Sequence, residues 1–331
     1  SARSVKTEVK GTLNGDGEFG DSRVNGGALQ HNDAVASVAA VRPGLCLSGS
    51  KDQSIVLYDY ITRKQLERWT GHTDSITKVW YGSRCSGVFS ASRDKTVKLW
   101  RAGNPHWVQE YAGHSLVVTA IHLNSDNTQL CSGSRDNSVK LWDVETAKCI
   151  KTNTIPQNLV TDVKFVPCSS WIVQTGEDKE VRVLDSRTLE PIFSFPKKQY
   201  IQTCCDVSPD GNYVISASNG FTGNGCEGSL WDMRTRKLQL EYRGHHEAVE
   251  SCLFLPGTQT EALLASASRD CSVKVWSQDT GVCECEYVVD GAGPLTSLAA
   301  YPDGTILVGS FKCGVQVLKF SNKTLSPVFN F

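Results

Sequence analysis

One short pattern returns seven times along this 331-residue chain and constrains its fold more than any other feature. The pattern is a run of β-branched and polar residues that ends near an aromatic residue or a leucine. Successive spacings between these end residues are 42, 42, 42, 47, 45 and 42 positions. The end residues are Tyr58, Trp100, Trp142, Leu184, Trp231, Trp276 and Leu318. A period that recurs in this way predicts a set of equivalent units stacked side by side.

Each period contains four short segments of strand type. VKLW alternates β-branched with polar or large residues, GVFSAS and SITKVWY precede it, and segments such as QLERW or CIKTN follow the aromatic residue. A sheet of four short strands cannot bury both faces alone, so neighbouring sheets must stack. We therefore predict an all-β fold, a seven-bladed β-propeller with four antiparallel strands per blade, over residues 30–331. Residues 1–29 are predicted to form an N-terminal arm of low order or an edge strand.

Three repeats carry further residues at fixed distances. Gly71-His72, Gly113-His114 and Gly244-His245 precede the first strand of their repeats, and Ser-Arg-Asp and Leu-Trp or Val-Trp follow. This pattern resembles the WD-repeat β-propeller family over roughly residues 30–331. The resemblance implies a ring used as a binding platform, with a buried hydrogen-bond network inside each of these three blades. The implied network residues are His72, Ser90, Asp94, Trp100, His114, Ser132, Asp136, Trp142, His245, Ser266, Asp270 and Trp276.

Serine, histidine and aspartate together also invite a hydrolase interpretation. A nucleophile needs one site with an oxyanion hole, whereas this chain carries three copies of the set, so the structural interpretation is favoured and no catalytic residue is predicted. Three other blades depart from the pattern and are expected to lack the full network and to depend more on apolar packing. Their departures are Gln30-His31 and Tyr58 in blade one, Leu184 with no upstream His in blade four, and Asp290-Gly291 and Leu318 in blade seven.

Two segments could complete the ring. LSPVFNF at the C-terminal end could supply the outer strand of blade seven, or VKTEVKG near the N-terminus could pair there. We favour the C-terminal segment because Leu325, Val328, Phe329 and Phe331 are well suited to packing.

Charge and cysteine content exclude several classes of function. Lys and Arg total 34 and Asp and Glu total 35, for a net charge of -1, which argues against broad attraction to nucleic acid or membranes. No apolar run approaches the roughly 18 residues of a membrane span, so no membrane insertion is expected. The 13 cysteines are scattered and form no CxxC pair. They predict buried free thiols in a cytoplasmic protein, and no metal site.

The stretch SNGFTGNGCEGSLWD, residues 218–232, contains four glycines and five more residues than the matching part of the other repeats. A phosphate-binding loop needs a following helix, whereas a strand follows here, and the motif does not match GxxxxGK[ST]. We therefore predict no nucleotide or other cofactor, and a wide hairpin loop whose glycines permit positive φ. Phe221 in this loop either contacts a partner or folds back over the channel mouth.

The residue before each hairpin aspartate is mostly basic. Together with Lys197 and Lys198, these positions predict a basic ring on one face of a nearly neutral protein, suited to acidic or phosphorylated peptides. The alternative is local pairing with neighbouring Asp or Glu, or simple solvation. The candidate partner-binding residues are Lys51, Arg93, Arg135, Lys197, Lys198, Phe221 and Arg269.

Other motifs bear on the kind of partner. Trp231-Asp232-Met233-Arg234 resembles the WDxR signature of propellers that recruit substrates to cullin-type ubiquitin ligases, which makes Arg234 a candidate adaptor contact. The phrases IQTCCDVSPDG and SNGFTGNGCE resemble a WD-repeat relative linked to cilia. We predict a non-enzymatic protein-interaction scaffold, monomeric within a larger complex, acting as an adaptor in ciliary assembly or trafficking. The alternative is a substrate receptor of a ubiquitin ligase.

Overall fold

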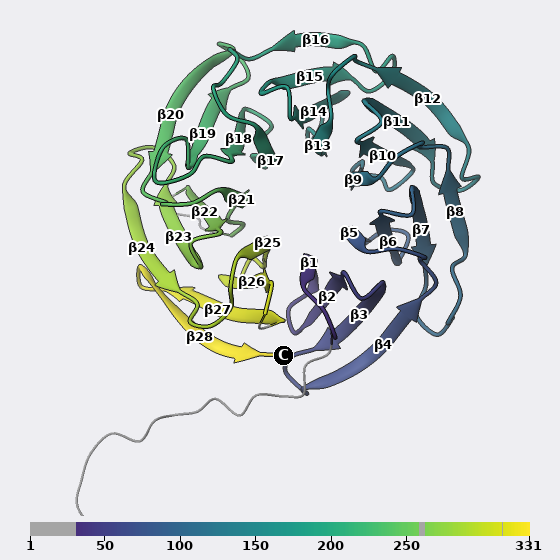
Figure 1. The fold of residues 1–331 in the computed structure, drawn as a ribbon, viewed down its shortest axis with the longest axis horizontal. Helices are drawn as coiled ribbons and strands as arrows, with labels where there is room; N and C mark the ends of the chain where they lie inside the picture. Colours follow the sequence, from purple (N-terminus) through teal and green to yellow (C-terminus); the bar gives the residue numbers. More distant parts are fainter. Residues whose placement is uncertain (1–30, 258–261, 313) are drawn as a thin grey trace, which may run out of the picture.

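The computed structural model describes residues 31–257, 262–312 and 314–331. In this part of the chain, 28 strands form seven four-stranded antiparallel sheets arranged as a ring around a central channel (Figure 1). The prediction of a seven-bladed propeller is therefore confirmed. The arm predicted over residues 1–29 lies outside the described residues. None of the described residues belongs to a helix long and apolar enough to cross a bilayer.

The four strands of each blade run in sequence order from the channel outward. Blades one to three comprise β1 (Val35–Arg42), β2 (Leu45–Ser50), β3 (Ser54–Asp59), β4 (Lys64–Thr70); β5 (Ile76–Gly82), β6 (Gly87–Ser92), β7 (Thr96–Trp100), β8 (Gln109–Ala112); β9 (Val118–Leu123), β10 (Gln129–Ser134), β11 (Ser138–Asp143) and β12 (Cys149–Thr154). Blades four and five comprise β13 (Val160–Phe165), β14 (Trp171–Gly176), β15 (Val181–Asp185), β16 (Pro191–Ser194); β17 (Gln202–Val207), β18 (Tyr213–Ser218), β19 (Glu227–Asp232) and β20 (Lys237–Arg243). Blades six and seven comprise β21 (Val249–Phe254), β22 (Leu263–Ser268), β23 (Ser272–Ser277), β24 (Cys283–Val288); β25 (Leu295–Ala300), β26 (Thr305–Ser310), β27 (Val315–Ser321) and β28 (Thr324–Asn330).

Antiparallel pairing divides the connections between two faces of the ring. One face, called here the network face, carries the turns between the second and third strands and the links from each outer strand to the next inner strand. The opposite face carries the remaining turns. Every inner strand therefore begins at the network face and ends at the opposite face.

The hydrophobic core lies between neighbouring blades. Phe89 and Tyr111 of blade two pack against Ile121, Leu130 and Trp142 of blade three in one buried cluster, for example. Since each sheet buries its faces only against its neighbours, the ring is stable as a whole and not blade by blade.

The C-terminal strand completes blade seven, as we expected from its apolar residues. β28 pairs with β27 along its length, and Phe331 exchanges two backbone hydrogen bonds with Val315, of 2.8 and 3.0 Å. The Phe331 ring lies 3.9 Å from the Tyr58 ring of blade one, centroid to centroid. Figure 1 shows the end of the chain beside β3, so this stack joins the last blade to the first.

Threonines near the start of the inner strands join successive blades. In five blades the threonine hydroxyl donates to a backbone carbonyl of the next inner strand, at 2.5 to 2.7 Å. The donor and acceptor pairs are Thr77 and Val118, Thr119 and Val160, Thr161 and Gln202, Thr203 and Val249, and Thr296 and Val35. These contacts form a polar collar around the channel.

Candidate interaction site

Blade two contains a buried chain of four polar side chains. Trp100 Nε1 donates to Ser90 Oγ at 2.8 Å, and Ser90 Oγ lies 2.7 Å from His72 Nε2. His72 Nδ1 lies 2.6 Å from Asp94 Oδ2. With the proton on Nδ1, every donor in this chain meets an acceptor, so the burial of four polar groups carries no unpaired penalty.

Blades three and six repeat this geometry. His114 bridges Ser132 and Asp136, with contacts of 2.7 and 2.9 Å, and Trp142 donates to Ser132 at 2.8 Å. The corresponding set in blade six is His245, Ser266, Asp270 and Trp276. The Gly-His pair follows from the same packing, because Gly113 has a φ of +151° and an added Cβ would lie 3.2 Å from the Trp142 ring.

The order Ser, His, Asp matches that of a hydrolase triad, but the serine is placed as a structural group. The tryptophan indole already donates to the serine oxygen, and Ser90 and Ser132 are fully buried. No substrate can reach these oxygens in the folded chain. The three sets therefore stabilise their blades and do not form active sites.

The aspartates of these sets give the fold an acid dependence. Burial pushes the pKa of Asp136 upward, but hydrogen bonds from Ser138 and Ser115, together with His114, outweigh it and bring the pKa to about 2. An unfolded aspartate titrates near pH ~3.9, so the unfolded chain takes up this proton first. We expect the free energy of unfolding to fall as the pH drops from about 4 towards 2. Urea unfolding at a series of pH values measures this loss.

Asp136→Asn is expected to have a shallower acid dependence than the wild type, because it lacks this carboxylate. Asp126→Asn is the matched control, since the Asp126 side chain is 63% exposed. If Asp136→Asn and the wild type lost stability in parallel on acidification, the proposed role of this carboxylate would be wrong.

Blade one departs from its expected packing. Tyr58 replaces the tryptophan, so the full network is absent, but His31 still contacts Ser48 at 2.8 Å and Asp52 at 3.1 Å. Three of the four members are therefore present, and apolar packing accounts for less of this blade than we predicted. Blade four has no such set: Gln174 and Asn158 are fully buried, without hydrogen-bond partners for their side-chain amides among the described residues.

Blade five keeps the tryptophan and the serine but has a glutamine in the role of the histidine: Trp231 Nε1 donates to Ser216 Oγ at 2.9 Å, and Ser216 Oγ donates to Gln202 Oε1 at 2.7 Å. Lys198 stands four positions before the inner strand, where His72 stands in blade two, and its ammonium group lies 2.8 Å from Glu227 and 2.6 Å from Glu241. The Lys198 side chain is only 11% exposed. Lys198 therefore points into its own blade and is not available to a partner, contrary to the sequence prediction. Lys197 is 59% exposed.

The residues before the hairpin turns form a ring at the channel mouth on the network face. In each blade the backbone N–H of this residue donates to the link that precedes the inner strand, at 2.9 to 3.1 Å, so the seven positions are equivalent. The ring consists of Lys51, Arg93, Arg135, Glu177, Asn219, Arg269 and Phe311. Asn219 and Phe311 are ring members that the sequence pattern did not predict.

Part of this positive charge is neutralised locally. Arg135 pairs with Glu177, Arg269 pairs with Glu250, and the Lys51 ammonium lies 4.1 Å from the centre of the Phe311 ring. The charged side chains that line the mouth are Arg93, Arg135 and Arg269 against Glu177 and Glu250, which leaves a net charge of +1 (3 − 2). Arg93 is exposed and makes no ion pair within the described residues.

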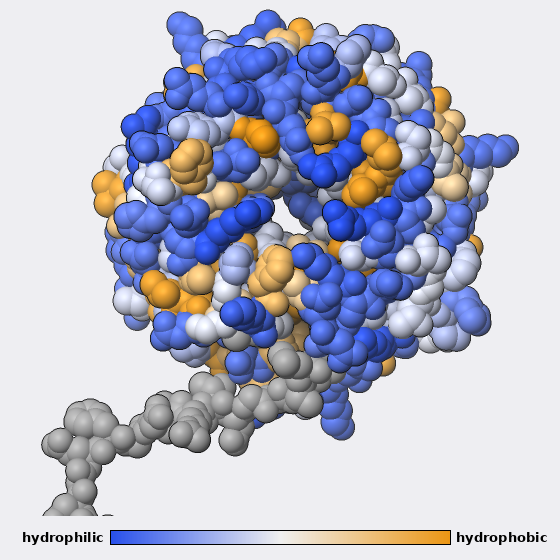
Figure 2. Space-filling view, viewed as in Figure 1, coloured by the Kyte–Doolittle hydropathy of each residue, from blue (hydrophilic) through white to orange (hydrophobic). Residues whose placement is uncertain are grey.

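The ring surrounds a depression of about 430 Å³ whose floor includes the threonine collar. Arg93, Arg135 and Arg269 line it together with Glu177 and Glu250. Figure 2 shows the central opening of the channel within a mainly hydrophilic surface that carries isolated hydrophobic side chains. Such a mouth can accept a polar, negatively charged group.

The glycine-rich insertion of blade five is a small ordered hairpin. Phe221 and Asn224 exchange two backbone hydrogen bonds of 3.0 Å, and the Gly223 N–H donates to the His246 carbonyl of blade six at 2.8 Å. An added Cβ on Gly225 would lie 2.1 Å from Tyr200, which explains a glycine there. The hairpin leaves Phe221 64% exposed on the network face.

Arg234 lies on the opposite face, in the turn between β19 and β20. Its guanidinium is 3.3 Å from Asp232 and 3.3 Å from the Tyr213 hydroxyl, and its side chain is 63% exposed. Arg187 binds Asp185 in the same way one blade earlier, at 2.8 Å. Both arginines therefore brace their own turns and keep an exposed edge.

No three His, Cys, Asp or Glu side chains within the described ranges come together as metal ligands. A family model, described as WD domain, G-beta repeat, matches residues 63–101, 106–143, 147–185, 189–222 and 236–277, more than half of the chain. The chain belongs to the WD-repeat family. WD-repeat propellers are generally non-enzymatic scaffolds for protein interactions.

The curated relatives of this WD-repeat chain are distant. Protein HIR1 of Gibberella zeae is 24% identical over 220 residues, which are 55% of this chain and 21% of that protein. Human Striatin-4 is 26% identical over 35% of this chain and 15% of its own length. The non-functional target of rapamycin complex subunit LST8-2 of Arabidopsis thaliana is 26% identical over 42% of each chain. In each case this chain aligns with less than half of the relative's length.

Proposed function

We propose that this WD-repeat protein is a scaffold that binds an acidic or phosphorylated segment of a partner protein at the channel mouth on the network face. The observation that carries the proposal is the depression of about 430 Å³ with three arginines in its wall and a net positive charge. Arginine binds carboxylate or phosphate through two parallel hydrogen bonds, which fixes the orientation of the bound group. The Arg93 guanidinium makes no ion pair within the described residues, so we expect Arg93 to bind the carboxylate or phosphate of the partner.

Apolar contacts complete the proposed surface. Phe221 and Phe311 are 64% and 44% exposed, and Leu116 in the link before β9 is 48% exposed. All three belong to connections on the network face. Exposed aromatic side chains beside a charged pocket are typical anchor points for a bound segment.

Charge reversal tests this proposal. Arg93→Glu combined with Arg135→Glu is expected to weaken the binding of acidic and phosphorylated peptides by tenfold or more, because each charge-assisted hydrogen bond contributes about 1.5–3 kcal/mol. Fluorescence anisotropy with a peptide panel of graded charge measures the affinity. The wild-type affinity should also fall as salt is raised.

Arg84→Glu combined with Arg234→Glu is the matched control. It makes the same charge change on the opposite face, where Arg84 is 66% exposed and pairs with Asp126. Binding that survived reversal at Arg93 and Arg135 would refute the proposed site.

The same control addresses the ubiquitin-ligase alternative. The exposed edge of Arg234 favours this second candidate, since a ligase adaptor would have to contact that side chain. If the protein is a substrate receptor, it co-purifies with a ligase adaptor and loses the adaptor when Arg234 is reversed. If it is the proposed scaffold, reversal of Arg234 leaves partner binding unchanged.

A cytoplasmic adaptor role in ciliary assembly or trafficking is our more specific proposal. It is supported by the sequence phrases around residues 201–211 and 218–227 that resemble a relative linked to cilia. Affinity purification from ciliated and non-ciliated cells would separate this role from a general one. Partners found equally in both would contradict it.

A further inference from the structure

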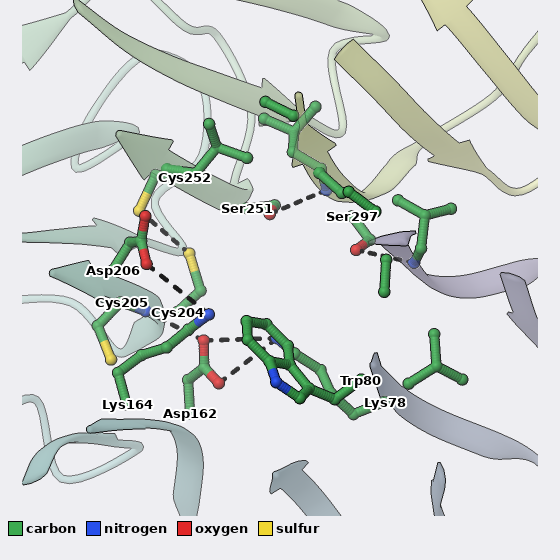
Figure 3. A pocket seen from close by; sticks show the side chains of 18 of the residues that line it. Lys78, Trp80, Asp162, Lys164, Cys204, Cys205, Asp206, Ser251, Cys252 and Ser297 are labelled. Atoms are coloured by element: carbon green, nitrogen blue, oxygen red, sulfur yellow. Dashed lines mark hydrogen bonds and ion pairs between the residues drawn. The ribbon is translucent and has the colours of Figure 1, made fainter. Parts of the chain in front are cut away.

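A cavity of about 220 Å³ occupies the end of the channel near the opposite face. Ala39, Ala40, Ala299 and Ala300 of blades one and seven supply its small side chains. Blades two, four and five supply charged side chains, of which Lys78 and Asp162 lie 3.4 Å apart (Figure 3). Two cysteine sulfurs from neighbouring blades also line this cavity.

These sulfurs face each other across the seam between blades five and six. Cys204 on β17 and Cys252 on β21 have their Sγ atoms 3.3 Å apart, as the dashed line in Figure 3 shows. Both residues are buried, with 5% and 6% exposure, but the cavity beside them connects them to the channel. The hydrogen bond from Thr203 to the Val249 carbonyl, 2.6 Å, holds the two strands together next to the pair.

The side chain two residues after the start of the inner strand, where Cys204 stands, faces the next blade at several seams of the ring. At four other seams the equivalent side chain accepts a hydrogen bond from a backbone N–H of the following inner strand, at 3.1 to 3.3 Å. The acceptors are Ser37, Asp162, Ser251 and Ser297. Between blades five and six, two thiols meet at this place instead. The propeller geometry, and not chance proximity on a mobile surface, therefore brings the sulfurs together.

We propose that Cys204 and Cys252 form a reversible disulfide when hydrogen peroxide enters the channel. A disulfide has a sulfur–sulfur distance of about 2.05 Å, so the two atoms must approach by roughly 1.2 Å, within reach of side-chain rotation. The contact with Cys204 and burial raise the pKa of Cys252. Cys252 therefore keeps its proton until the second step, and we assign the first attack to the Cys204 sulfur, which lies 3.3 Å from it.

The chemistry balances with one peroxide. The Cys204 thiol sulfur attacks one oxygen of hydrogen peroxide, the O–O bond breaks, and the thiol proton leaves with the released hydroxide as water, which gives a sulfenic acid. The Cys252 sulfur then attacks the sulfenic sulfur, the S–O bond breaks, and a second water leaves with the Cys252 proton. Both thiols are oxidised, the peroxide is reduced to two waters, and a dithiol reductant restores the pair.

The product joins two blades covalently. The bond closes a loop between residues 204 and 252 and restricts the unfolded chain, so the oxidised protein should resist unfolding more than the reduced protein. It also fixes the seam that carries the Phe221 hairpin, since Gly223 already binds blade six through the His246 carbonyl.

Mass spectrometry of the intact wild-type chain tests the assignment. The protein is treated with hydrogen peroxide, its free thiols are alkylated, and it is digested with trypsin without reduction. We expect a cross-link between peptides 199–234 and 244–269, of which the second contains Cys252 as its single cysteine. Since the first contains Cys204, Cys205 and Cys226, fragmentation must place the bond on Cys204. A bond to Cys205 or Cys226, or Cys252 that remains fully alkylated, would overturn the proposal.

A stability measurement provides the second readout. Peroxide is expected to raise the midpoint of thermal unfolding of the wild type by several degrees, and a dithiol reductant should reverse the rise. Cys252→Ala should abolish the rise, whereas Cys131→Ala, a buried cysteine of blade three, should retain it. A rise that persisted in Cys252→Ala would overturn the assignment, even if that variant started from a lower midpoint.

Discussion

Replacing Trp142 by alanine is expected to lower the free energy of unfolding by about 4 kcal/mol. Its ring is 1% exposed and packs between blades two and three, at 6.0 Å from Tyr111 and 6.1 Å from His114, centroid to centroid. The change opens a cavity in this cluster. It also removes the indole N–H that donates to Ser132, so the polar chain through His114 loses its first donor.

Chemical denaturation monitored by circular dichroism measures this loss. Trp107→Ala is the matched control, because Trp107 is 40% exposed and its indole lies outside the network, over the Lys98 ammonium. We expect a clearly smaller loss for the control. Equal losses for the two tryptophans would show that the network and the interblade packing contribute little.

Phe331→Ala is expected to lower the free energy of unfolding by a similar amount, about 4 kcal/mol. Phe331 is 3% exposed, and its ring stacks on Tyr58, so it belongs both to blade seven and to the core of blade one. Each blade is stable only against its neighbours, so weakening this single seam weakens the whole ring. The variant should unfold at lower denaturant in one cooperative transition.

Phe221→Ala is the control for this change. Phe221 is 64% exposed, so its removal should alter the free energy of unfolding by no more than about 0.5 kcal/mol. If Phe331→Ala were as stable as Phe221→Ala, the stack of Phe331 on Tyr58 would not close the ring.

The repeat period was sufficient to predict the number of blades and strands. A spacing of 42 residues places Trp100 and Trp142 at equivalent positions of successive sheets, and four short segments per period leave few other arrangements. The same period carries a signal that we did not use. Thr77, Thr119, Thr161 and Thr203 are also 42 residues apart, and they form the collar between blades.

Side-chain contacts within a blade were harder to predict, because a residue that replaces a network member can bind a partner that is distant along the chain. In blade five Gln202 accepts the hydrogen bond from Ser216 that a histidine accepts in blade two, while Lys198 pairs with Glu227 across the five-residue insertion. The sequence therefore predicted Lys198 as a partner-binding residue, because the carboxylates that surround it in space are distant along the chain.

Contacts around the ring depend on which blades become neighbours. Glu177 follows Arg135 by one full period, and only the closed ring brings them into an ion pair. Cys204 and Cys252 are likewise 48 residues apart, and only their place on adjacent inner strands brings the sulfurs to 3.3 Å. For this reason, neither the local pairing of the arginines at the mouth nor the contact between the two thiols could be predicted from the sequence.

Hydrogen–deuterium exchange with a bound peptide tests the central claim of a docking site at the channel mouth most directly. The acidic or phosphorylated peptide that binds the wild type most tightly in the charge-reversal experiment is the ligand. We predict slower exchange in the network-face connections, at residues 51–53, 93–95, 135–137 and 219–226. Protection restricted to the turns of the opposite face, such as residues 60–63 and 233–236, or to the outer strands would contradict it.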